Sequence, residues 1–128
     1  MGFVGKQAVE ATRFLEVLEA KIEAEEGPFK VPFPFLPVAC RGLASRLEGE
    51  VVPRDFISAT EHYLEDMQSG TDSSTGEPMP VAVTGMPQAM SAIVRLTIAE
   101  LVREAFGDDF ADTVKDQYKA MTGEQRPT

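Results

Sequence analysis

His62, the only histidine in the chain, lies in the acidic segment 60–66 and is the first candidate for chemistry. In a helix, His62 and Asp66 share one face, so they could supply two ligands to a metal ion. A working site needs at least one more ligand, and the paired Glu-x-x-His pattern of di-iron bundles is absent from the sequence. A solvated acidic helix face explains the segment more simply. We therefore predict no metal site and no cofactor.

Cys40 is the second candidate, because a thiolate paired with His62 could act as a nucleophile. A reactive thiolate needs a partly exposed, electropositive surrounding, whereas Cys40 falls on the apolar face of its segment, beside Leu36 and Leu43. Such a cysteine usually packs as a small hydrophobe. The sequence also lacks the Gly-x-Ser-x-Gly turn of serine hydrolases and any glycine-rich phosphate loop. These observations predict that the protein is not an enzyme.

A proline-rich apolar arm, residues 28–37, is the most unusual segment of the chain. Its prolines remove backbone N–H donors along one edge, so the arm can pair along its other edge only, or form a polyproline II helix. In an extended chain, alternate side chains line one face. We predict that this apolar face lies in a groove of this chain or of a partner. Its contact residues would be Phe29, Val31, Phe33 and Phe35.

Methionines cluster with three prolines shortly before the most apolar part of the chain. Flexible thioethers fill irregular gaps in a core more often than they form binding surfaces, but they suit both uses. Because a loop and a second extended segment flank the cluster, we add it to the predicted protein interface. Its members are Met79, Met86 and Met90.

Five segments place apolar residues at helical spacing, and glycine or proline marks most of their ends. The fourth segment is apolar nearly all round, with a thin polar strip through Arg95, Glu100 and Arg103. Such a helix is typical of a central position or of an oligomer contact. Residues 69–80 have no periodicity and are rich in turn formers, which predicts a flexible loop. The predicted helices are residues 4–25, 37–47, 53–69, 87–106 and 108–123.

These elements predict an all-α fold of about five helices in a compact orthogonal or bundle-like array. We expect one helical domain over residues 1–123 and a frayed tail over residues 124–128. A chain of 128 residues buries roughly two thirds of its unfolded surface, so it needs no disulfide or metal to fold.

Acidic residues outnumber basic ones 21 to 12, for a formal net charge of -9. Such a surface repels phosphate backbones and anionic lipids, so we expect no direct binding of nucleic acid. No run of residues is long and apolar enough to span a membrane, and residues 1–20 contain no apolar signal core. A single cysteine excludes an internal disulfide and suits a reducing compartment, so we expect a cytoplasmic location.

Together these features favour a protein-interaction or structural subunit, such as an adaptor or assembly factor, that binds a protein partner or itself. Short acidic helical chains with apolar arms are common in larger assemblies, phage particles included. One alternative is a helical carrier of an apolar ligand. Another is an acidic inhibitor that occupies the nucleic-acid site of a basic partner. Its phosphate-like array would consist of Glu61, Glu65, Asp66, Glu100, Glu104, Asp108, Asp109, Asp112 and Asp116.

Overall fold

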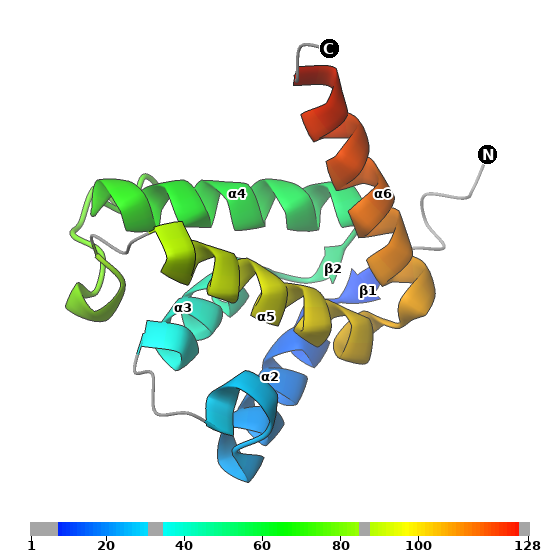
Figure 1. Ribbon diagram of the computed structural model, residues 1–128, viewed down its shortest axis with the longest axis horizontal. Coiled ribbons are helices and arrows are strands. Elements are labelled where there is room, and N and C mark those ends of the chain that lie inside the picture. The colour runs from blue at the N-terminus through cyan, green and yellow to red at the C-terminus, as the bar shows by residue number, and fades with distance from the viewer. Residues whose placement is uncertain (1–7, 31–34, 85–87, 126–128) are drawn as a thin grey trace.

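The computed structural model describes residues 8–30, 35–84 and 88–125 (Figure 1). These residues form five α-helices, two 3₁₀ helices and one two-stranded sheet, so the prediction of an all-α fold is confirmed. The α-helices are α2 (Thr12–Ala24), α3 (Phe35–Ala44), α4 (Pro53–Ser69), α5 (Gln88–Phe106) and α6 (Asp108–Gln125). The shorter elements are β1 (Val9–Glu10), β2 (Glu50–Val51), η1 (Gly27–Lys30) and η2 (Val81–Val83).

The first predicted helix is shorter than its periodicity suggested. Val9 and Glu10 pair with β2 in an antiparallel ladder, and the N–H of Ala11 donates to the carbonyl of Gly49 at 2.9 Å. This pairing keeps residues 9 and 10 extended, so α2 begins at Thr12. At its other end α2 stops at Ala24, because Glu25 adopts a left-handed conformation with a φ of 53°. The predicted residues 4–7 lie outside the described part of the chain.

The last three helices keep most of their predicted ends. Pro53 opens α4, where its missing N–H costs no helical hydrogen bond. Gly70 closes it with a φ of 82°. Gly107, with a φ of 94°, separates α5 from α6. The end of α6 was predicted wrongly, because the helix passes through Gly123 and continues to Gln125. A glycine near a helix end costs only about 1 kcal/mol and does not by itself stop the helix.

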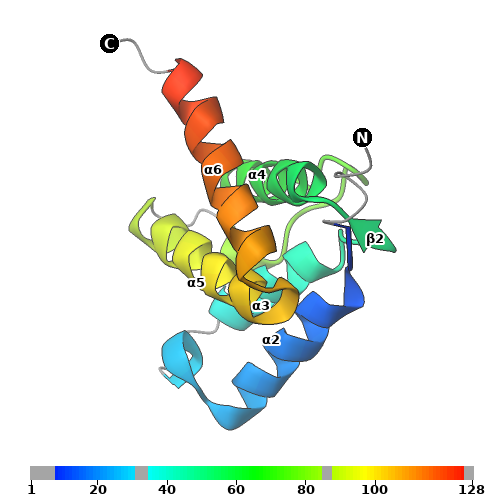
Figure 2. The same cartoon turned by 90° about the vertical axis from the view of Figure 1, so that its right-hand side faces the viewer.

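The helices surround one apolar core. α5 packs against α2 and α6, α6 also packs against α4, and α3 contacts α2, α4 and α5. Figures 1 and 2 both show the C-terminal end of α6 standing clear of the other helices. The buried cluster draws on all five helices and contains Leu36, Cys40 and Leu43, the predicted apolar face of α3. Its aromatic centre consists of Phe14, Phe56, Phe106 and Phe110, whose neighbouring ring centroids lie 4.9–6.4 Å apart.

α3 and α4 approach each other closely at Gly42. A Cβ atom at this position would lie 1.9 Å from the hydroxyl oxygen of Tyr63, which is buried on α4. Burial raises the pKa of Tyr63 to about 12, and the guanidinium of Arg46 lies 4.8 Å from the centroid of its ring. The absence of a side chain at Gly42 therefore sets the distance between the two helices.

The arm, residues 28–37, is not extended over its whole length as predicted. Residues 28–30 belong to η1, and α3 already begins at Phe35, two residues before Pro37. A proline in the first turn of a helix disrupts no hydrogen bond, so the chain can become helical before Pro37. Residues 31–34 lie outside the described part of the chain.

The predicted flexible loop, residues 69–80, contains a closed turn. Thr71 and Pro78 form an antiparallel bridge, and the N–H of Gly76 donates to the carbonyl of Asp72 at 2.7 Å. The N–H of Asp72 donates to the carbonyl of Glu77 at 2.8 Å. The segment is irregular, as expected, but the prediction of a flexible loop did not anticipate these bonds.

Candidate functional site

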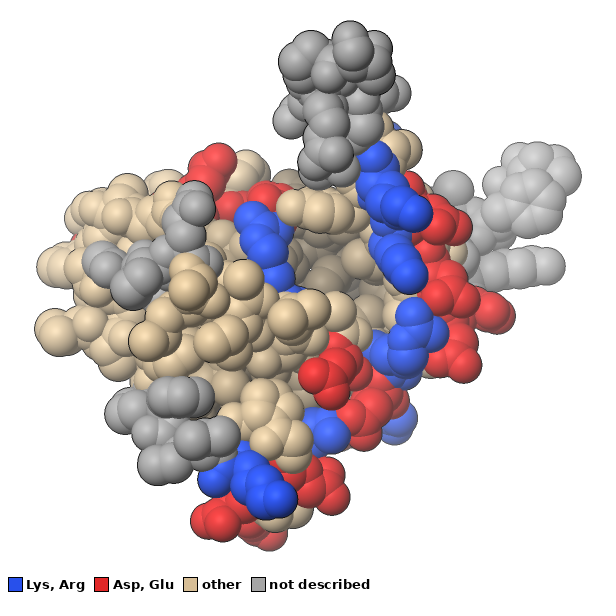
Figure 3. Space-filling model, viewed as in Figure 1, with Lys and Arg blue, Asp and Glu red and all other residues tan. Residues whose placement is uncertain are grey.

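A groove of about 760 Å³ runs between α4, α5 and α6 and opens to solvent. Figure 3 shows the hollow near the centre of the molecule, with charged side chains at its upper left and along its right side and with uncharged residues below it. Most lining side chains are apolar, which makes this the strongest candidate for a binding site among the described residues. The lining consists of Phe56, Ile57, Thr60 and Glu61 of α4, of Arg95, Leu96, Ile98, Ala99, Glu100, Val102, Arg103 and Glu104 of α5, and of Ala111, Val114, Lys115 and Tyr118 of α6.

The sequence of α5 explains why one wall of the groove is apolar on both sides. The inner face of the helix contributes Val94, Ile98 and Leu101 to the core. The outer face exposes Leu96, which is 67% accessible, although it belongs to the same apolar run. Three exposed alanines continue that outer face at spacings of three and four residues, namely Ala89, Ala92 and Ala99. α5 is therefore a helix with a second apolar stripe that this chain leaves uncovered.

Arg95 joins the three helices at one end of the groove. Its guanidinium donates two hydrogen bonds to the carboxylate of Glu61 on α4, one of them at 3.1 Å, and another at 3.0 Å to the hydroxyl of Tyr118 on α6. The hydrogen bond to Glu61 raises the pKa of Arg95, although burial opposes the shift. This charged cluster links α4, α5 and α6 through the side chain of one residue.

The groove differs from the rest of the molecule in its charge. Of the 12 Lys and Arg and 21 Asp and Glu in the chain, three of each kind line the groove. The whole net charge of -9 therefore lies elsewhere. Along the chain, residues 78–94 contain no charged side chain at all. In this segment Val81, on η2, is 91% accessible.

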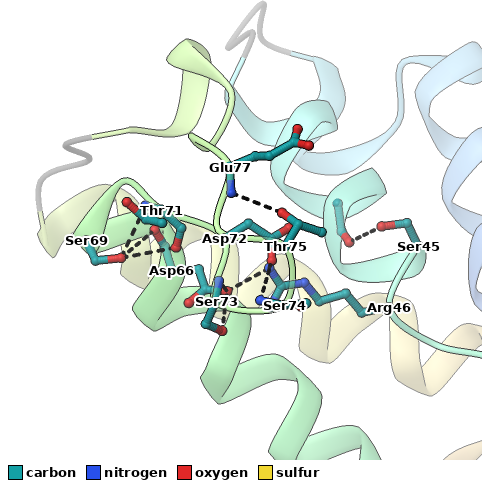
Figure 4. A network of polar contacts seen from close by, with 11 residues as sticks. Ser45, Arg46, Asp66, Ser69, Thr71, Asp72, Ser73, Ser74, Thr75 and Glu77 are labelled. Carbon is teal, nitrogen blue, oxygen red and sulfur yellow. Dashed lines mark hydrogen bonds and ion pairs between the residues drawn. The ribbon is translucent and has the colours of Figure 1, made fainter.

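A polar network holds the turn of residues 71–78 against the end of α4 (Figure 4). The carboxylate of Asp66, only 5% accessible, accepts hydrogen bonds from Arg46 at 2.7 Å and from the N–H and hydroxyl of Ser73 at 3.0 Å each. Burial alone would raise the pKa of Asp66, but these hydrogen bonds outweigh it and hold the pKa below its ordinary value. Arg46 also pairs with Asp72 at 3.3 Å. The network thus fixes the turn that precedes the uncharged segment.

The two residues considered for chemistry lie in different surroundings. Cys40 is fully buried, and burial raises the pKa of its thiol to about 12, so the thiol is neutral and shielded from solvent. His62 is exposed beside a small polar hollow that Arg46 and Ser73 also line. Asp66, which was considered as a second metal ligand, is buried and bound to Arg46, whereas a solvated position was expected. Among the described residues, no group of three or more His, Cys, Asp and Glu could hold a metal ion.

The predicted interface residues do not gather at the groove. Phe29, Phe35 and Met79 are buried in the core of this chain, and Met90 is half-buried against it. For Phe29 and Phe35, the predicted contact of the arm is therefore made within the same chain, by its core. Val31, Phe33 and Met86 lie outside the described residues.

The groove was not predicted from the sequence, although one pattern in the sequence belongs to it. The thin polar strip of the fourth predicted helix, Arg95, Glu100 and Arg103, is the strip that lines the groove. The position of the other wall depends on how α6 leaves α5 after Gly107. The angle between α5 and α6 cannot be predicted from the periodicity within either helix.

No protein-family model, curated protein or solved structure that was compared with this chain matches it. In the described part of the chain, no helix is both long and apolar enough to cross a membrane.

Proposed function

We propose that this protein is a non-enzymatic interaction subunit, an adaptor or assembly factor that binds helical protein segments in the groove between α4, α5 and α6. The observation that supports the proposal is Leu96, a large apolar side chain left 67% accessible at the mouth of an apolar groove. A buried leucine contributes roughly 2 kcal/mol relative to an exposed one, so a partner that covers it gains free energy.

A helix is the element that suits this surface. Exposed alanines flank Leu96 on α5, and small side chains let a second helix approach closely. The groove is open along one side, so an amphipathic helix can lie in it with its apolar face against the lining residues. The single buried cysteine suits a reducing compartment, and we place the protein in the cytoplasm as part of the same proposal.

The acidic-inhibitor alternative has less support, because most of the relevant carboxylates already have cationic partners in this chain. Arg103 pairs with two of them, Asp108 and Asp112. Three others pair with cations outside their own helix: Glu61 with Arg95, Asp66 with Arg46 and Glu104 with Lys21. A carboxylate held by an internal arginine or lysine presents less negative charge to a basic partner.

The carrier alternative has one specific observation in its favour, since the groove volume of about 760 Å³ falls within the range of small-molecule sites. Native mass spectrometry of the purified protein separates the two functions. A copurified apolar molecule that Leu96→Glu releases would favour the carrier.

The interaction role is tested by displaying a library of amphipathic helical peptides and selecting those that bind the full chain. We expect bound peptides to lose roughly tenfold or more in affinity for Leu96→Glu, because a charge then occupies the contact. Leu15→Glu is the matched control, since Leu15 is exposed on α2 and does not line the groove. Peptides that bind both variants as well as the original chain would contradict the proposal.

A further inference from the structure

We propose that the partner in the groove is a second copy of this chain, in a dimer whose two-fold axis runs along the groove. This inference rests on the proposed function and names the partner. In such a dimer, α5 of each copy lies against α6 of the other.

The charge of the groove is the first argument for a second copy. An isologous interface brings the same face of two molecules together. Any net charge on that face is therefore repelled by the same charge on the partner. Two molecules of net charge -9 repel each other, and this repulsion is smallest between faces that are locally neutral. The groove is such a face, because it contains three basic and three acidic side chains.

The second argument comes from two charged residues on opposite walls. Glu100 of α5 and Lys115 of α6 both line the groove, and neither forms a hydrogen bond or ion pair among the described residues. Glu100 contributes only a longer-range effect, helping to raise the pKa of Lys21, which Glu104 already binds at 2.6 Å. Opposite charges on opposite walls are what a self-complementary face requires.

These two residues also select the direction of the symmetry axis. An axis along the groove exchanges its walls, so Glu100 of each copy faces Lys115 of the other. An axis across the groove would instead place α5 against α5 and α6 against α6. Glu100 would then lie on the side of the partner's Glu100, and Lys115 on the side of the partner's Lys115, so like charges would come together. The first arrangement is therefore favoured electrostatically.

The apolar side chains fit the same arrangement. With α5 of one copy over α6 of the other, Leu96 approaches the stripe of Val114, Tyr118 and Met121. Met121 is 46% accessible, at the end of α6 that stands clear of the body in Figures 1 and 2. Each copy would thus cover the exposed leucine of the other with the apolar residues of its α6.

The test begins with sedimentation of the full chain over a range of concentrations. We expect the original chain and Leu15→Glu to dimerise, and Leu96→Glu to remain a folded monomer with an unchanged melting temperature. Leu96 is exposed in the single chain, so this substitution does not disturb the core. A chain that is monomeric throughout, or a dimer that persists in Leu96→Glu, would overturn the dimer.

A charge exchange between copies tests the geometry. Lys115→Glu and Glu100→Lys should each weaken the homodimer roughly tenfold, because each places two like-charge contacts in one dimer. A mixture of the two variants should recover the original affinity, since both contacts are then attractive. Glu65→Lys is the control: it changes the net charge as Glu100→Lys does, but lies outside the groove. Mixing that restores nothing, or an equal effect of Glu65→Lys, would refute the arrangement.

The two proposals fail separately. A monomer whose groove binds displayed helices through Leu96 would overturn the dimer and leave the interaction role standing. Absence of any association that depends on Leu96 would overturn both.

Discussion

Replacing Asp66 by alanine is expected to lower the free energy of unfolding by about 3 kcal/mol. Its carboxylate accepts three hydrogen bonds, and each bond to a charged acceptor typically contributes about 1.5 kcal/mol or more. The simple sum is an upper value, because Ser73 is exposed and regains water when the turn opens. Arg46 also keeps its contact with Asp72, so the loss falls below that of a fully orphaned buried cation.

Urea unfolding followed by circular dichroism measures this loss, which corresponds to a fall in melting temperature of about 10 °C. Glu65→Ala is the matched control, since Glu65 lies next to Asp66 on α4 but is exposed. It should change the free energy of unfolding by no more than about 0.5 kcal/mol. Proteolysis within residues 71–78 should accelerate in the Asp66 variant alone. A loss under about 1 kcal/mol would show that the network does not hold the turn.

Acid should remove the same contribution in a defined direction. Because the pKa of Asp66 is lowered in the folded state, its stabilisation is complete above the ordinary carboxyl pKa of about 4. It is lost as the pH falls through the lower, folded-state pKa. The difference in stability between the original chain and Asp66→Ala should therefore be constant from about pH 7 to pH 5 and shrink below that range. A difference that grows on acidification would contradict the lowered pKa.

Three further predictions concern buried positions. Cys40 should react with a thiol reagent only at the rate at which the protein unfolds, since its thiol is buried and its pKa is about 12; faster labelling of the native chain would revive a chemical role. Gly42→Ala should lower the free energy of unfolding by about 2 kcal/mol because its Cβ meets Tyr63, whereas a gain of about 1 kcal/mol from helix propensity alone would show that the ring moves aside. Phe35→Ser should cost about 3 kcal/mol without changing the association state seen by light scattering, with exposed Leu15→Ser as the control. An altered association state would return the arm to the interface.

The helices could be predicted because their signals are local. Each has an apolar period, and proline or glycine stands at most of the ends, as at Pro53 and Gly70. The two-residue strands could not be predicted, since Val9 and Glu10 are too few to show an alternation. The bond between Arg46 and Asp66 was also beyond sequence reasoning, because Arg46 follows α3 and meets Asp66 of α4 only after the two helices pack. The arm was misjudged in part for a similar reason: its alternation did not show that a 3₁₀ helix and an α-helix bury Phe29 and Phe35 in the core of the same chain.

The features of the groove do not weigh equally in the case for a dimer. Alanine is the best helix former, so Ala89, Ala92 and Ala99 on an exposed face have a local explanation. A single exposed leucine such as Leu96 is common on protein surfaces. Local preference does not, however, explain a neutral face on a chain of net charge -9. Nor does it explain Glu100 and Lys115, which stand unpaired on opposite walls although most neighbouring charges are paired. Recovery of affinity on mixing the two charge variants is therefore the decisive observation, because neither helix propensity nor a contact within one chain can produce it.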